Sequence, residues 1–258
     1  TGSPPSREQA LSVQGNHYVT QPHIGVLQEK SLHASVKAWY ARPQDRVEER
    51  VDGYVIDIVR DDDLLVEIQT RSFAPLKRKL GELTQTRSVR LVHPIATEKW
   101  IVKVDADGEP FGRRKSPKRG RVEDVFNEMV SIGHLVERET FAVEVLLIQE
   151  EVVRCYDGNG SWRHPEWRAY DRRLLEVVEQ CRFEEAADFL KFLPNGVDLP
   201  RPFTNRELSK AAGVRLALAG KMTYSLRHMG ALSVIGKKGN AQLFEEAEGM
   251  PAAESEVA

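Results

Sequence analysis

The chain has 258 residues, a net charge of −2 and 41% hydrophobic residues, which is enough for two domains with cores of their own. No run of 18 apolar residues occurs and the first residues lack a signal-peptide pattern, so we expect neither a membrane partner nor secretion. Two cysteines, Cys155 and Cys181, exclude a disulfide framework and a four-thiolate zinc site, and they favour the cytoplasm.

Positive charge is concentrated in two segments of the chain. Residues 201–240 hold eight Lys or Arg and one acid, Glu207, which gives a local charge of +7. Residues 113–121 hold six basic residues and no acid, whereas the tail from Glu245 onward is acidic. Because phosphate binding depends on the distribution of charge rather than on its total, this pattern favours DNA as a partner.

The N-terminal half predicts a helix followed by two buried strands. Residues 1–20 are rich in Ser, Pro and Gln, and we expect them to be disordered. The apolar spacing over 25–40 predicts an amphipathic helix that ends before Pro43. Residues 51–59 and 64–70 are apolar on both faces, which is typical of buried strands, and three aspartates form the turn between them.

The remaining elements of this half alternate between helices and strands. The patterns predict a basic amphipathic helix at 73–87, strands at 89–93 and 100–104, a basic loop at 113–121, a helix at 122–132, strand structure at 141–155, a Gly- and Trp-rich connection at 157–168 and a helix at 174–193. Within the loop, the four cations Arg113, Arg114, Lys118 and Arg119 either clamp phosphates or are solvated. Trp162, Trp167 and Tyr170 either anchor packing or stack on bases.

Two acids interrupt the apolar runs of the predicted hairpin. If the hairpin is centred on Asp62, residue i lies opposite residue 124 − i, and Asp57 lies opposite Glu67. Facing carboxylates destabilise a sheet unless a partner compensates them, and hard oxygen ligands suit Mg²⁺ or Mn²⁺. Gln69 lies on the same face as Glu67. Alternatively, the register is shifted and one acid reaches solvent.

The order of helix, acidic hairpin and basic helix resembles the PD-(D/E)XK nuclease superfamily, above all its Holliday-junction resolvases and restriction endonucleases. The resemblance implies an α/β fold with a restriction-endonuclease-like mixed sheet flanked by helices. It implies that Asp57 and Glu67 bind Mg²⁺ or Mn²⁺ and that Glu29 on the first helix completes the site. Gln69 stands where the family has a catalytic lysine, so activation of water would depend on the metal.

The basic C-terminal segment predicts a helix, a turn, a second helix and a hairpin. Thr204 and Glu207 form a capping box, Gly213 supplies the turn, and the second helix runs from Leu216 to Met229. The arrangement resembles winged helix-turn-helix domains, which bind DNA or dock proteins. The resemblance implies DNA contacts by the following side chains of the second helix and the hairpin tip: Lys221, Thr223, Tyr224, Arg227, Lys237 and Lys238.

These patterns divide the chain into a tail (1–20), a nuclease-like domain (21–155), a connecting segment (156–182), a small α+β winged-helix domain (183–245) and an acidic tail (246–258). The first functional hypothesis is a Mg²⁺-dependent endonuclease of repair, recombination or defence, and a homodimer is compatible with it. The alternative is a DNA-binding or regulatory protein with an inactive nuclease-like core.

Overall fold

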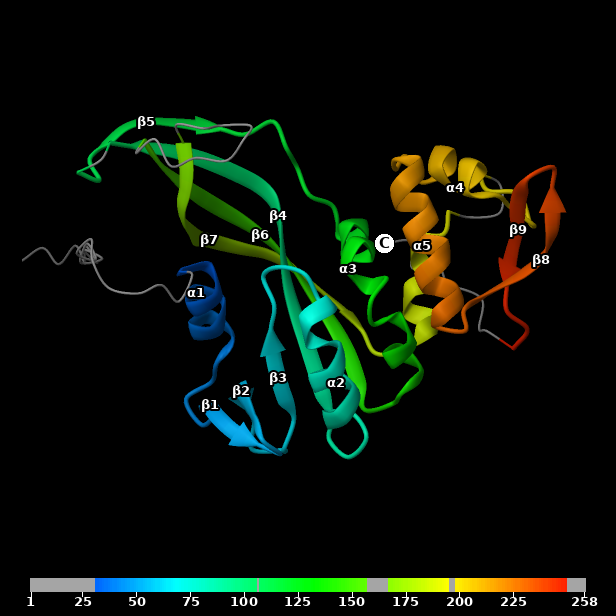
Figure 1. Cartoon of the computed structure of the whole chain (residues 1–258), viewed down its shortest axis with the longest axis horizontal. Coiled ribbons are helices and arrows are strands. Elements are labelled where there is room, and N and C mark those ends of the chain that lie inside the picture. The colour runs from blue at the N-terminus through cyan, green and yellow to red at the C-terminus, as the bar shows by residue number, and fades with distance from the viewer. Residues whose placement is uncertain (1–30, 106, 157–166, 195–197, 250–258) are drawn as a thin grey trace, which may run out of the picture.

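A large mixed β-sheet with helices on both faces organises the chain (Figure 1). The computed structural model describes residues 31–105, 107–156, 167–194 and 198–249, apart from the side chains of 31 and 168–170. The predicted N-terminal tail, residues 250–258 of the predicted acidic tail, the first residues of the first predicted helix with Glu29, most of the 157–168 connection with Trp162, and the side chain of Tyr170 lie outside the described residues. No helix in the described ranges is long and apolar enough to cross a membrane.

The sheet combines an antiparallel meander with parallel central strands. The first three strands pair antiparallel, β3 pairs parallel with β4, β4 pairs parallel with β6, and β7 returns antiparallel to β6. Strand β5 pairs with the part of β4 that lies beyond β3. The strands are β1 (Arg46–Val51), β2 (Tyr54–Val59), β3 (Leu65–Ile68), β4 (Val89–Val104), β5 (Pro110–Lys115), β6 (Phe141–Tyr156) and β7 (Trp167–Phe183).

Helices cover the two faces of this sheet with separate apolar clusters. Helix α1 (Ser31–Tyr40) buries Leu32, Val36 and Tyr40, which are spaced by one helical turn, against one face. The other face is covered by α2 (Lys77–Leu83), which follows the 3₁₀ turn η1 (Ala74–Leu76), by η2 (Val122–Val125) with α3 (Phe126–Met129), and by η3 (Gly133–Glu137).

The C-terminal elements follow the predicted order closely. After η4 (Ala186–Phe192) come α4 (Asn205–Ala211), α5 (Leu216–His228), β8 (Leu232–Lys238) and β9 (Ala241–Glu246). Thr204 and Glu207 form the predicted capping box at the start of α4. Gly213 and Gly230 adopt φ of 62° and 72°, the left-handed region that favours glycine at the ends of helices. Phe203 bridges Phe244 and thereby ties the hairpin to the start of α4.

The C-terminal elements share one apolar core with the sheet. Met222 and Leu226 of α5 belong to the same buried cluster as Phe126 and Met129 of α3. The contact is close at Gly133, where an added Cβ would lie 3.4 Å from the carbonyl oxygen of Ser225. The two parts are therefore joined by buried packing rather than by a linker alone.

Three predictions of secondary structure were wrong. Residues 174–193, predicted as a helix, form the second half of β7 and η4, because register shifts in β7 interrupt the alternation that would mark a strand. Arg113 and Arg114, expected in a loop, lie in β5. The sequence of β1, RVEERV, is too charged to resemble a buried strand, and this edge strand was missed.

Truncation at the shared core should destabilise the whole chain. Leu226 is fully buried between α5 and the sheet elements, so we expect Leu226→Ala to lower the free energy of unfolding by about 2–5 kcal/mol. Leu216→Ala on the same helix is the control, because Leu216 is 52% exposed and its truncation should cost less than about 0.5 kcal/mol. Urea titration followed by circular dichroism measures both, and separate transitions for the two parts would contradict a shared core.

Candidate active site

The β2–β3 hairpin has the register expected from the sequence. Ile58 pairs with Val66 and Val59 pairs with Leu65, as the rule of residue i opposite 124 − i requires. The ladder ends there, and the backbone N–H of Ile68 donates a 2.8 Å hydrogen bond to Oδ2 of Asp57. The Asp57 carboxylate is therefore fixed at the point where the backbone pairing of the two strands stops.

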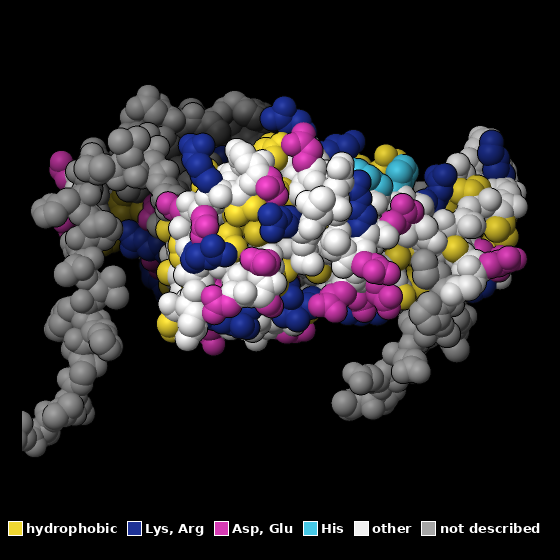
Figure 2. All heavy atoms as spheres, turned by 90° about the horizontal axis from the view of Figure 1, so that it is seen from below, with side chains coloured by type: hydrophobic (Ala, Val, Ile, Leu, Met, Phe, Trp, Pro, Cys, Tyr) yellow, Lys and Arg dark blue, Asp and Glu magenta, His cyan; other side chains and the backbone are white. Residues whose placement is uncertain are grey.

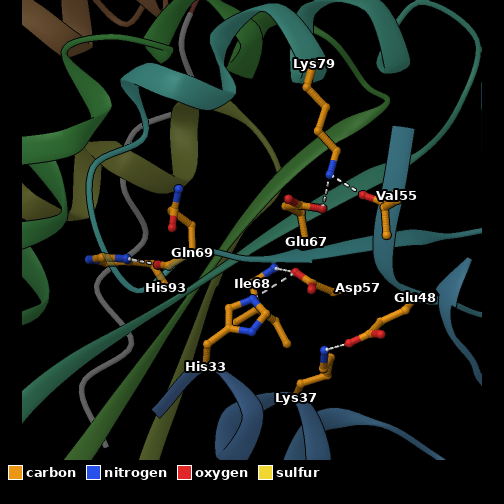
Figure 3. A network of polar contacts seen from close by, with 10 residues as sticks. All are labelled: His33, Lys37, Glu48, Val55, Asp57, Glu67, Ile68, Gln69, Lys79 and His93. Carbon is orange, nitrogen blue, oxygen red and sulfur yellow. Dashed lines mark hydrogen bonds and ion pairs between the residues drawn. The ribbon is translucent and has the colours of Figure 1, made fainter. Parts of the chain in front are cut away.

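Asp57 is held in its charged form by groups from α1 and β3. Nε2 of His33 lies 3.2 Å from Oδ2 of Asp57, on the side opposite Lys79 in the view of Figure 3. Burial raises the pKa of Asp57, but the hydrogen bonds from His33 and Ile68 and the positive charge of Lys37 outweigh it, so that the pKa is lowered. Asp57 is thus an ionised carboxylate in a half-buried position.

Glu67 is more deeply buried and is paired with a lysine. Nζ of Lys79 donates to Oε2 of Glu67 at 2.6 Å and to the carbonyl oxygen of Val55 at 2.6 Å (Figure 3). Burial, which leaves Glu67 9% exposed, raises the pKa of its carboxyl, and the negative charge of Asp57 raises it further against the attraction of Lys79. The two carboxylates therefore lie near enough to repel each other.

Lys79 is the site residue that the sequence did not reveal. It belongs to the basic amphipathic helix predicted at 73–87, and nothing in the sequence links its cations to the carboxylates of the hairpin. In α2 its side chain is 14% exposed, whereas that of Arg78 is 83% exposed. The sequence signal that could have revealed Lys79 is its position directly before Leu80, which is fully buried. A residue beside the apolar stripe of a helix can turn toward the sheet that the stripe covers.

Hydrogen bonds of its backbone fix the position of Gln69. Its carbonyl oxygen lies 2.5 Å from Nδ1 of His93, and burial lowers the pKa of that histidine. The backbone N–H of Gln69 donates to the carbonyl oxygen of Val92 at 2.9 Å, whereas its side-chain amide makes no hydrogen bond with a described residue. The Lys79 ammonium, and not the Gln69 amide, thus provides the polar contact to Glu67.

The two carboxylates are the described residues that could hold a divalent cation. All their hydrogen bonds with described residues reach Oδ2 of Asp57 and Oε2 of Glu67, so one oxygen of each remains available. Hard oxygen donors of this kind suit Mg²⁺ or Mn²⁺. No cluster of three or more His, Cys, Asp or Glu suited to a metal occurs among the residues that the structure describes, and Glu29 lies outside them.

Some of the side chains predicted to contact DNA on α5 and its hairpin are exposed, whereas others bond to residues of the protein itself. Tyr224, Arg227 and Lys237 are exposed. Nζ of Lys221 donates to the Asn127 amide oxygen at 3.0 Å. Thr223 is 1% exposed and its hydroxyl donates to Oδ1 of Asn205 at 2.7 Å, so its burial against α4 is incompatible with the predicted groove contact. At the hairpin, Lys238 is exposed but lies 3.1 Å from Glu207.

The cations at 113–121 are partly neutralised by acids of the sheet. Arg113 pairs with Glu151 at 2.9 Å, and Arg119 lies 3.7 Å from Glu98. In the described chain, Arg114 and Lys118 make no ion pair. Acidic and basic side chains are also interspersed over the face seen in Figure 2. Net attraction for a polyanion therefore depends on a few unpaired cations rather than on the whole segment.

Comparisons with known proteins identify a family without a known function. Residues 30–184 match the model of a family described as a domain of unknown function, DUF8091. The chain is 28% identical over 224 residues to an uncharacterized protein of Treponema pallidum (strain Nichols), covering 86% of this chain and 87% of that protein. No solved structure matches.

Asp57→Asn and Glu67→Gln should alter the pH dependence of stability in opposite ways. The folded-state pKa of Glu67 exceeds its ordinary value of 4.5, so the stability gained by protonating it is lost as pH rises through that pKa. The folded-state pKa of Asp57 is below its ordinary value of 3.8, so its contribution is present above pH 3.8 and is lost as pH falls. Urea titrations from about pH 3 to pH 7 measure both differences from wild type, and slopes of the same sign would contradict the assignment.

Proposed function

The chain belongs to the DUF8091 family, and we propose that it is a metal-dependent endonuclease that hydrolyses phosphodiester bonds in DNA. One observation carries the proposal. Two neighbouring carboxylates, Asp57 and Glu67, lie where the β2–β3 ladder ends, and the half-buried ammonium of Lys79 is 2.6 Å from the second. Two carboxylates so placed can share a divalent cation, and the metal together with the ammonium would supply positive charge to a phosphodiester.

The order of elements supports a restriction-endonuclease-like core. A helix, α1, precedes the acidic hairpin, and a basic helix, α2, follows it and leads into β4, which pairs parallel with β3. This is the arrangement on which the resemblance to PD-(D/E)XK nucleases rests. Lys79 removes the main objection to the resemblance, because a cation from α2 reaches Glu67 although Gln69 replaces the expected lysine.

Each residue of the site then has a role that its contacts support. Asp57 and Glu67 would hold Mg²⁺ or Mn²⁺, which supplies positive charge to a phosphodiester under attack. His33 and the Ile68 amide orient Asp57. Lys79 orients Glu67 and places a positive charge beside it, where it can stabilise negative charge on the phosphate.

The C-terminal elements support DNA binding by a winged-helix arrangement. The hairpin β8–β9 follows α4 and α5, and the segment 201–240 carries the local charge of +7. One face of α5 is buried against α3, so Tyr224 and Arg227 on its exposed face are the groove contacts that we propose, with Lys237 at the hairpin. Because the unit shares a core with the sheet, it would present DNA in a fixed orientation.

A second function is favoured because each of the two carboxylates already has a partner within the protein. Asp57 has a hydrogen-bond partner in His33, Glu67 has an ion-pair partner in Lys79, and the described residues offer no third carboxylate ligand. A core balanced in this way needs no metal, which would leave a DNA-binding or regulatory protein with an inactive nuclease-like domain.

Cleavage of DNA distinguishes the two functions. With Mg²⁺ or Mn²⁺, the wild type should cut labelled linear, supercoiled or branched DNA, and Glu67→Gln should abolish cutting. Lys79→Met should slow cutting by about 10²- to 10³-fold, because a charge aimed at the phosphate is lost. Lys77→Met is the matched control, since Lys77 is exposed on the same helix and its loss should leave the rate unchanged.

Metal binding should appear as stabilisation of the folded state. Mg²⁺ or Mn²⁺ at about 100 times its dissociation constant should add about 2.7 kcal/mol to the free energy of unfolding of the wild type, and Asp57→Asn should remove this gain. Differential scanning fluorimetry measures the effect. An unchanged wild type that still binds DNA in a salt-sensitive manner would establish the inactive core instead.

A further inference from the structure

Three aromatic side chains meet at the end of the sheet where β5, β6 and β7 lie together, and this group is called the aromatic tip. Phe111 of β5 and Tyr156 of β6 both lie against Trp167 of β7, with ring centroids 6.0 Å and 5.1 Å from the tryptophan. Phe111 is 60% exposed and Tyr156 is 46% exposed. Grouped exposed rings keep an apolar surface in water, which marks an interaction site more often than a single exposed ring does.

Strand pairing and a bulge set the positions of these side chains. Tyr156 and Trp167 are paired residues of β6 and β7. In β5, Gly112 pairs with Lys103 and Pro110 pairs with Val104, so Phe111 is the extra residue of a bulge. Bulges re-aim a side chain out of the regular alternation, and this one brings Phe111 to the tryptophan.

Two basic side chains, one on β4 and one on β5, add positive charge to this end of the sheet. Nζ of Lys103 lies 4.5 Å from the Trp167 ring centroid and forms no ion pair with a described residue. Arg114 follows Phe111 by three residues in β5, is exposed, and likewise forms no ion pair with a described residue. The carboxylate of the nearby Asp105 is hydrogen-bonded within its own turn, because its Oδ1 accepts from the backbone amides of Asp107 and Glu109.

We propose that the aromatic tip binds unpaired nucleotides of a nucleic acid strand. Exposed ring faces stack on bases, and the cations of β4 and β5 that form no ion pair with a described residue contact the phosphates that connect those bases. A duplex hides its base faces, so it would contact the cations but not the rings. The combination of open rings with unpaired positive charge thus selects a single strand over a duplex.

The aromatic tip is separate from the proposed cleavage site and from α5. Figure 1 places β5 at the end of the long strands, away from the β1–β2 hairpin and from the C-terminal elements. The strands β4 and β6 run continuously from the region beside β3 to this end. A strand held at the aromatic tip would therefore lie on the same rigid sheet as Asp57 and Glu67, although its binding requires neither.

The test measures binding of the full chain to labelled oligothymidylate of about 12 nucleotides by fluorescence anisotropy, in EDTA so that neither metal nor cleavage contributes. Oligouridylate and a duplex of equal length are measured alongside. We expect Phe111→Ala and Tyr156→Ala each to weaken single-strand binding by about 5- to 150-fold and to leave duplex binding unchanged. Arg114→Ala should lower the slope of log affinity against log salt by about 0.7.

Two controls separate stacking from general effects. Trp39→Ala removes an aromatic side chain of α1 that is 45% exposed, and it should leave binding unchanged. Phe111→Leu keeps an apolar side chain without a ring and should weaken binding as Phe111→Ala does. The proposal is overturned if the wild type binds neither single strand, if Phe111→Leu binds like the wild type, or if Trp39→Ala loses as much affinity. None of these results bears on cleavage by Asp57 and Glu67.

Discussion

The cost of placing carboxylates inside a β-sheet governs how this chain is built. An isolated buried charge costs several kcal/mol, and it is retained only with a partner. Glu67 is met by Lys79 from α2, and Asp57 is met by His33 from α1. The two helices therefore contribute charge as well as apolar packing, and each must lie on its own face of the sheet.

The same constraint recurs on β6. Glu144 is 1% exposed, accepts a 2.8 Å hydrogen bond from the Tyr40 hydroxyl and lies within 3.7 Å of Arg90. Glu150 is fully buried and binds Arg172 of β7. Arg90 and Arg172 come from β4 and β7, the two strands beside β6, so these buried acids connect β6 to both of its neighbours. The hairpin differs because the negative charge of Asp57 raises the free-energy cost of ionising Glu67 beside it. A purely structural arrangement would avoid this repulsion.

Local signals in the sequence predicted the local geometry correctly. The turn of three aspartates set the β2–β3 register, and the capping box at Thr204 with the glycines at 213 and 230 set the boundaries of α4 and α5. Lys79 could not be assigned in the same way, because its partner depends on how α2 is rotated against the sheet. Thr223 was misplaced for a similar reason: α5 turns one face toward both α4 and α3, and only tertiary packing decides which residues that face contains. Strand β7 was missed because its bulges disturb the period of two on which strand prediction depends.

The packing of α5 limits how the two ends of the molecule can act together. Since Met222 and Leu226 are buried in the shared core, α5 cannot rotate to present its other face without breaking that core. Under the proposed function, DNA bound at Arg227 and Lys237 would therefore be held at a constant position relative to the β2–β3 hairpin. Under the proposed function, the reach from the C-terminal elements to Asp57 and Glu67 is set by rigid packing, so the cleavage position would be defined by the structure of the DNA and not by the length of a linker. A duplex that branches or frays would satisfy this fixed geometry with one part at α5 and an unpaired strand at the aromatic tip.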